Sequence, residues 1–197
     1  MLMTNYSFWD RPTRFLHLGL AATVTVQLLV SLWMVGPASR HPATALEHAG
    51  FVVHEWVGLC ALVIVLAHWL WSLQSSGDAG IRHLFPLDRE GRREVLAELR
   101  VLGSGRRVEQ GPGGGLAGLA HGLGLLAVTA IAATGGVLFV LLSGFRDNPA
   151  LTHTVAHLHA LVSNFVWVYW FGHVGMALLH QFRGDGVLRR MFSLSKD

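Results

Sequence analysis

HEWVGLCALVIVLAH (residues 54–68) and HALVSNFVWVYWFGH (residues 159–173) decide the fold class of this chain. Each is an apolar segment that begins and ends with a histidine, fourteen positions apart. At about 100° per residue, fourteen positions come within roughly 40° of a whole number of turns, so both histidines of a segment lie on one helix face. A rise of ~1.5 Å per residue separates them by ~21 Å, most of the way across a hydrocarbon core ~30 Å thick. The pattern indicates two membrane-crossing helices that carry imidazoles at two depths.

The composition also indicates a membrane protein. Hydrophobic residues make up 52% and charged residues 14% of the 197 residues, and the mean hydropathy is +0.45. These values are too apolar for an ordinary soluble domain. Four apolar runs have about the twenty residues that a spanning helix needs, at about 15–35, 51–73, 116–142 and 159–180. We therefore expect an all-α integral membrane four-helix bundle, formed as a single membrane domain over residues 1–197.

The segments outside the spans carry their own structural signals. Asp10 and Pro12 are expected to cap and open the first helix. The connection 74–115 is the longest, and within it residues 89–102 have the helical periodicity of a segment on the membrane surface. The run GPGGG at 111–115 is expected to be a hinge.

The distribution of positive charge predicts the orientation. All but two of the 15 Lys and Arg residues lie in the N-terminal tail, in the connection 74–115 or in the C-terminal tail, and the exceptions are Arg40 and Arg146. Because excess positive charge stays on the cytoplasmic side, both termini and this connection are expected to be cytoplasmic. Charges placed between apolar spans indicate contact with membrane lipid and not with nucleic acid.

This topology orders the histidines by depth. His54 and His159 lie near the outer ends of their helices and are expected to face each other. His173 is deeper, and its partner is either His17 or His68, between which spacing alone does not choose. Ionisable groups inside a membrane are costly and usually functional, so imidazoles at matching depths favour metal ligation over isolated hydrogen bonds. Two such pairs suit two stacked haems, and the absence of a CxxCH motif excludes covalently attached haem.

The other histidines near the spans are assigned by their position. His121 and His180 are expected near the inner pair and the cytoplasmic headgroups. A structural role is favoured for His121, whereas both a structural and a functional role stay open for His180. His153 and His157 are expected at the interface, because His157 lies about 160° away from His173 around the helix.

Four motifs of this chain resemble those of one family: WDRPTRFLH (9–17), HEWVG (54–58), the segment 159–173 and HQFRGDGVLRRMF (180–192). The family is the prokaryotic cytochrome b561 family, which includes the b-type subunits of nickel-iron hydrogenases. The resemblance covers all four helices and implies a location in the bacterial inner membrane. It implies two haem b groups with four axial ligands: His17, His54, His159 and His173. His68 departs from the pattern, because the family commonly has an arginine there, and it is the reserve ligand for the inner haem.

Bis-histidine ligation leaves no open position for oxygen activation, so electron transfer is the expected chemistry. The resemblance implies a quinone as the mobile donor or acceptor. Quinone chemistry needs a titratable group beside a haem, for which His180 and His121 are the candidates. Arg14, one turn before His17, is expected either to pair with a haem propionate or to anchor the helix on the positive side of the membrane.

Three functions are compatible with this pattern. The first is a di-haem cytochrome that transfers electrons between the quinone pool and a periplasmic redox protein or small oxidant or reductant. The second is the membrane anchor and electron-transfer subunit of a larger oxidoreductase such as a hydrogenase. A histidine-lined metal transporter ranks last, because Glu55 and Cys60 are the only carboxylate and thiol clearly inside the spans. Whether the chain is itself an enzyme is left open.

Overall fold

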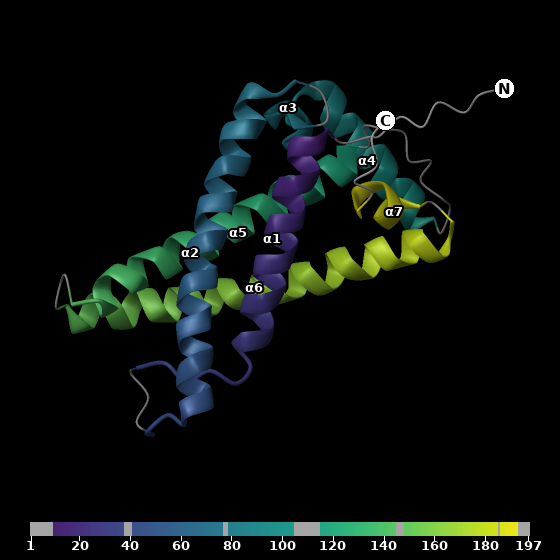
Figure 1. Ribbon diagram of the computed structural model, residues 1–197. Helices are drawn as coiled ribbons and strands as arrows, with labels where there is room; N and C mark the ends of the chain where they lie inside the picture. Colours follow the sequence, from purple (N-terminus) through teal and green to yellow (C-terminus); the bar gives the residue numbers. More distant parts are fainter. Residues whose placement is uncertain are drawn as a thin grey trace. The chain divides into compact units, whose positions relative to one another are not determined.

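Four long apolar helices form the framework of the protein, as expected from the hydropathy (Figure 1). They are α1 (Arg11–Val30), α2 (Ala45–Gln74), α5 (Gly115–Leu142) and α6 (Pro149–Phe182), and each is long and apolar enough to cross a membrane. The described residues also form three shorter helices, α3 (Ile81–Leu84), α4 (Arg89–Gly103) and α7 (Val187–Phe192). The computed structural model describes residues 10–37, 41–76, 79–104, 115–144, 148–184 and 186–192, and no strand occurs among them. The prediction of an all-α protein with four long apolar helices is confirmed.

Polar caps make two of these helices longer than their apolar cores. α2 begins at Ala45 because Thr44 and Glu47 form a capping box, in which the Thr44 backbone N–H donates to Glu47 Oε2 (2.8 Å) and the Glu47 N–H donates to Thr44 Oγ1 (3.3 Å). α6 begins at Pro149 because Asn148 Oδ1 accepts from the backbone N–H of Leu151 at 3.0 Å, and proline suits a first helical position. Hydropathy detects only the apolar part of such helices.

The first helix begins as predicted and ends earlier than the predicted span. Its N-terminus is capped by Asp10, whose Oδ1 accepts from the Thr13 N–H at 2.8 Å. The helix ends at Val30, and the chain turns through Leu32 and Trp33, whose N–H groups bond three residues back to Leu29 and Val30. The apolar run continues to residue 35, but its last residues form this turn and not a further helical turn.

The described chain divides into two compact units, and both take parts of the four long helices. The first unit combines residues 1–15, 68–126 and 173–197. Within it, Trp71 Nε1 donates to Thr13 Oγ1 at 3.1 Å, and Trp69 stacks on Phe85 with ring centroids 6.2 Å apart. α3 lies directly on α5, because a Cβ added at Gly118 would collide with the backbone carbonyl of His83. This close approach requires glycine.

The connection between α2 and α5 belongs to this first unit. Its helix α4 (Arg89–Gly103) matches the expected helix at 89–102. It is tied to α5 by Glu98, whose Oε2 accepts from the Leu116 N–H at 2.8 Å. Val95 of α4 is buried, whereas Leu96 and Leu99 are exposed. Of the GPGGG run, 111–114 lie outside the described residues, and Gly115 begins α5.

The second unit combines residues 16–67 and 127–172 and contains segments of all four long helices. Val65 and Val166 are its most deeply buried side chains, with exposed fractions of 0% and 2%. Trp170 Nε1 donates to Thr25 Oγ1 at 3.1 Å, which links α6 to α1. By contrast, Phe165, Val168 and other large apolar side chains are exposed along these helices, as expected for helices that face lipid.

Candidate cofactor site

His54 of α2 and His159 of α6 face each other inside the second unit. Their ring centroids are 6.1 Å apart and their planes make an angle of 81°. Both side chains are half-buried. The contact brings together the two histidines that their predicted depth had paired.

A cavity of about 160 Å³ lies beside these rings, within the same unit. Both imidazoles line it, together with Gly135 and Gly136 of α5 and mainly apolar side chains of α1, α2, α5 and α6. A concave apolar space with a few convergent polar groups is typical of a cofactor or ligand site. Glycine keeps this space open, since a Cβ at Gly135 would lie 3.2 Å from His159 Cε1.

The hydroxyl of Thr134 determines which nitrogen of His159 is available. Thr134 Oγ1 lies 2.9 Å from His159 Nδ1, and it also lies 2.9 Å and 3.0 Å from the carbonyl oxygens of Ala130 and Ile131. A hydroxyl has one hydrogen, and a carbonyl oxygen can only accept. Thr134 therefore donates to a backbone carbonyl and accepts from the Nδ1–H of His159. This tautomer leaves the lone pair of Nε2 free to bind a metal.

His54 is oriented through its backbone and leaves a ring nitrogen without a partner. The Nε2 amide of Gln27 donates to the His54 carbonyl oxygen at 2.8 Å. Gly58 makes room for this amide, since a Cβ there would lie 2.6 Å from Gln27 Nε2. His54 Nδ1 and Gln27 Oε1 are both buried without a hydrogen-bond partner among the described residues. Buried polar atoms of this kind call for an explanation, and a missing ligand is one.

The geometry of the pair fits a metal held between two imidazoles. Two ring nitrogens that bind one metal from opposite sides at about 2 Å place the ring centroids about 6 Å apart. The observed separation of 6.1 Å agrees with this value. The free Nε2 of His159, the orphaned nitrogen of His54 and the mainly apolar side chains around them suit a b-type haem held by these two histidines.

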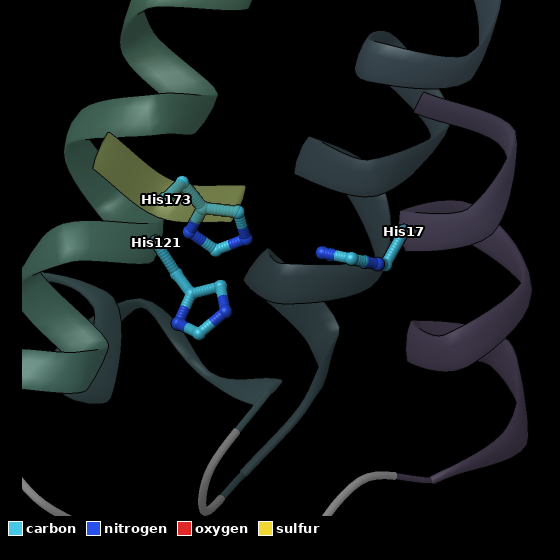
Figure 2. A group of neighbouring side chains, drawn as sticks. All are labelled: His17, His121 and His173. Atoms are coloured by element: carbon cyan, nitrogen blue, oxygen red, sulfur yellow. The ribbon is translucent and has the colours of Figure 1, made fainter. Parts of the chain in front are cut away.

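The first unit holds a second group of histidines. His121 of α5 and His173 of α6 have ring centroids 5.4 Å apart with planes at 80°, and Figure 2 shows the two rings next to each other. His121 Nδ1 donates to the Ala117 carbonyl oxygen at 2.8 Å, which leaves its Nε2 as an acceptor. His68 Nδ1 lies 3.3 Å from Ser72 Oγ. The structure thus places His121 beside the predicted ligand His173.

Three other predicted site residues are described individually. His17, also drawn in Figure 2, is half-buried on α1 and belongs to the second unit. Arg14 is buried, with an exposed fraction of 5%, and belongs to the first unit. His180 is half-buried in the last turn of α6. The pairing of His17 with His173 stays a prediction.

Sequence reasoning missed two residues that contact the His54–His159 pair. Thr134 and Gln27 are polar residues in the middle of apolar helices, which is the only signal that the sequence offers for them. Their partners lie 25 and 27 residues away along the chain, so the contacts depend on helix packing.

Four long apolar helices and a histidine pair across an apolar cavity define a class: membrane proteins that hold a metal-centred cofactor between helices. The sequence profile of the family described as prokaryotic cytochrome b561 matches residues 8–194, nearly the whole chain. The chain therefore belongs to the prokaryotic cytochrome b561 family. No curated protein and no solved structure matches it. As a member of this family the protein is a multi-pass membrane electron-transfer protein, and the family binds b-type haem.

Proposed function

We propose that the protein is a di-haem b-type cytochrome that transfers electrons between the quinone pool and a periplasmic redox partner. The observation that carries the proposal is the His54–His159 pair, with ring centroids 6.1 Å apart beside an apolar cavity. These two histidines would be the axial ligands of one haem b. His17 and His173 would be those of the second, as the family resemblance implies.

The residues of the His54–His159 site would bind the haem and keep its environment dry. When bound, haem b supplies a one-electron iron couple, and two axial imidazoles leave no position for oxygen. Thr134 holds His159 in the tautomer that a metal needs, and Gln27 fixes the backbone of His54. The apolar walls exclude water, which together with the hydrogen bonds to the ligands tunes the redox potential.

Haem content of single variants tests this assignment. His54→Ala and His159→Ala should each remove the same haem and leave about one haem per chain, because each removes one of two ligands. His48→Ala is the control, since His48 is exposed near the start of α2 and lies outside this site. The measurement is haem b per chain by pyridine haemochrome, with the protein purified in detergent. If either variant keeps both haems, the pairing is wrong.

His17 and His173 would hold the second haem, and Arg14 would pair with one of its propionates. Burial of Arg14 within the first unit supports a specific role for its guanidinium, since a purely solvated anchor would be exposed. His68 is the reserve ligand. Its Nδ1 lies near the hydroxyl of Ser72, so its other ring nitrogen is the one available to a ligand.

We propose that both termini are cytoplasmic and that quinone reacts on the cytoplasmic side, near the haem of His17 and His173. The positive charge of the tails and of the connection 74–115 supports this orientation. His180, two turns after His173 on α6, would take up or release a proton at a ring nitrogen as quinone is reduced or quinol oxidised. Imidazole exchanges protons near neutral pH, which suits this role.

His180→Ala tests the assignment of the quinone site. The variant should slow reduction of the haems by a short-chain quinol by roughly 100-fold, the lower end of what general acid–base groups contribute. Both haem spectra should stay as in the wild type. The assay is stopped-flow absorbance of the purified protein, with His48→Ala as the control. Unchanged rates would move the quinone site elsewhere, and a lost haem would make His180 a ligand.

A further inference from the structure

His153 and His157 form a second pair of imidazoles, apart from the His54–His159 site. They lie four residues apart in the first turns of α6, so they occupy one face of the helix. Their Nε2 atoms are 3.1 Å apart, with ring centroids at 4.3 Å and planes at 64°. Both side chains are exposed. The two nitrogens therefore lie close enough to bind one ion, on side chains that are exposed.

This separation is the one that a single metal ion requires of two neighbouring ligands. Imidazole nitrogens bind Zn²⁺ at about 2.0–2.1 Å, so two of them at adjacent corners of a tetrahedron or an octahedron lie about 3 Å apart. The observed 3.1 Å falls at this value without any movement of the helix. Water can complete the coordination because the pair is exposed.

A hydrogen bond and a shared metal ion require different protonation of the two rings. The short contact joins Nε2 to Nε2, so one ring must place its proton there while the other offers a lone pair. With a metal ion both rings would offer their Nε2 lone pairs and carry their protons on Nδ1. Neutral imidazoles bind Zn²⁺, Ni²⁺ and Cu²⁺, whereas Mg²⁺ and Ca²⁺ require oxygen ligands.

We propose that His153 and His157 form a binding site for one divalent transition-metal ion at the beginning of α6. Cu²⁺ should bind more tightly than Zn²⁺, in the order that nitrogen ligands generally follow, and Mg²⁺ should not compete. The site uses no residue of the proposed haem ligand set. Its existence therefore does not depend on the haem assignments.

Titration of the purified full-length protein with ZnCl₂ tests the site. The protein carries no polyhistidine tag, is treated with a chelator first and keeps its haem. Calorimetry should show that the wild type binds one Zn²⁺ per chain. The affinity for Zn²⁺ should fall at least about tenfold in His153→Ala and in His157→Gln, because the helix holds the second imidazole at high effective concentration. His48→Ala, another exposed histidine of the second unit, should bind Zn²⁺ as the wild type does. Unchanged haem spectra report that each variant is folded.

A second measurement identifies the ligands directly. The electron paramagnetic resonance spectrum of one equivalent of Cu²⁺ on the oxidised protein should show coupling to two imidazole nitrogens, and to one in His153→Ala. The proposal is overturned if the wild type binds no Zn²⁺, if both variants bind it as tightly as the wild type, or if His48→Ala weakens binding as much as they do.

Discussion

Replacing Thr134 by valine removes one hydrogen bond to a proposed haem ligand and little else. Valine has nearly the shape of threonine, so the helix and the cavity should persist. The Nδ1–H of His159 loses its acceptor, 2.9 Å away, in a half-buried position beside an apolar cavity. An acceptor at this nitrogen makes the imidazole a stronger donor to the metal. A stronger donor favours ferric over ferrous iron, so losing the acceptor should raise the midpoint potential of the haem.

The size of this rise in midpoint potential follows from the free-energy cost of an unsatisfied buried N–H, about 1–3 kcal/mol. If about 1 kcal/mol of this cost is specific to the ferric state, the midpoint potential rises by about 40 mV, because for one electron about 59 mV corresponds to about 1.4 kcal/mol. Haem retention should also weaken by about 10–100-fold, the usual effect of losing such a partner of a metal ligand.

The assay is a spectroelectrochemical titration of the purified protein. Thr23→Val is the matched control, because the Thr23 hydroxyl bonds to the carbonyls of its own helix in the same way, at 2.8 Å to Gly19 and 3.3 Å to Leu20. Neither of these bonds involves a histidine ring. The midpoint potential of one haem should rise in Thr134→Val, and the midpoint potentials of both haems should be unchanged in Thr23→Val. Equal potentials in Thr134→Val and the wild type would refute the role of Thr134 and the ligation of His159 through Nε2.

Two further predictions concern the haem sites. Gly135→Ala should reduce haem content by displacing the ring of His159, since the added Cβ would lie 3.2 Å from its Cε1. The control Gly172→Ala has no atom within 4 Å of the added Cβ and should keep both haems. Full haem content in Gly135→Ala would show that the cavity tolerates a methyl group. His17→Ala should lose the second haem while His68→Ala keeps it, as measured by pyridine haemochrome. The reverse result would make His68 the ligand.

The sequence predicted the helices better at their apolar centres than at their ends. Runs of about twenty apolar residues can only be buried in a membrane or a large core, so the four long helices follow from hydropathy. The early start of α6 does not follow from hydropathy, because it depends on the cap made by Asn148 and on Pro149. The capping box of Thr44 and Glu47 extends α2 in the same way, and its S/T-x-x-E pattern is visible in the sequence.

The histidine contacts were predictable to different degrees. His54 and His159 could be paired because the second and fourth spans both run from the outer to the inner side in the predicted topology, so residues near the start of each lie at equal depth. Thr134 could not be assigned to this pair, because its contact depends on the rotation of α5 against α6. The contact between His153 and His157 is indicated by their four-residue spacing, but the interfacial position predicted for both does not by itself imply it.

The haem b content of the wild-type protein tests the central claim most directly. The purified chain, quantified by amino-acid analysis and assayed by pyridine haemochrome, should carry two haem b groups per chain with the absorption bands of low-spin bis-histidine iron. One haem per chain or none, or a high-spin spectrum that indicates an open axial position, would contradict the account.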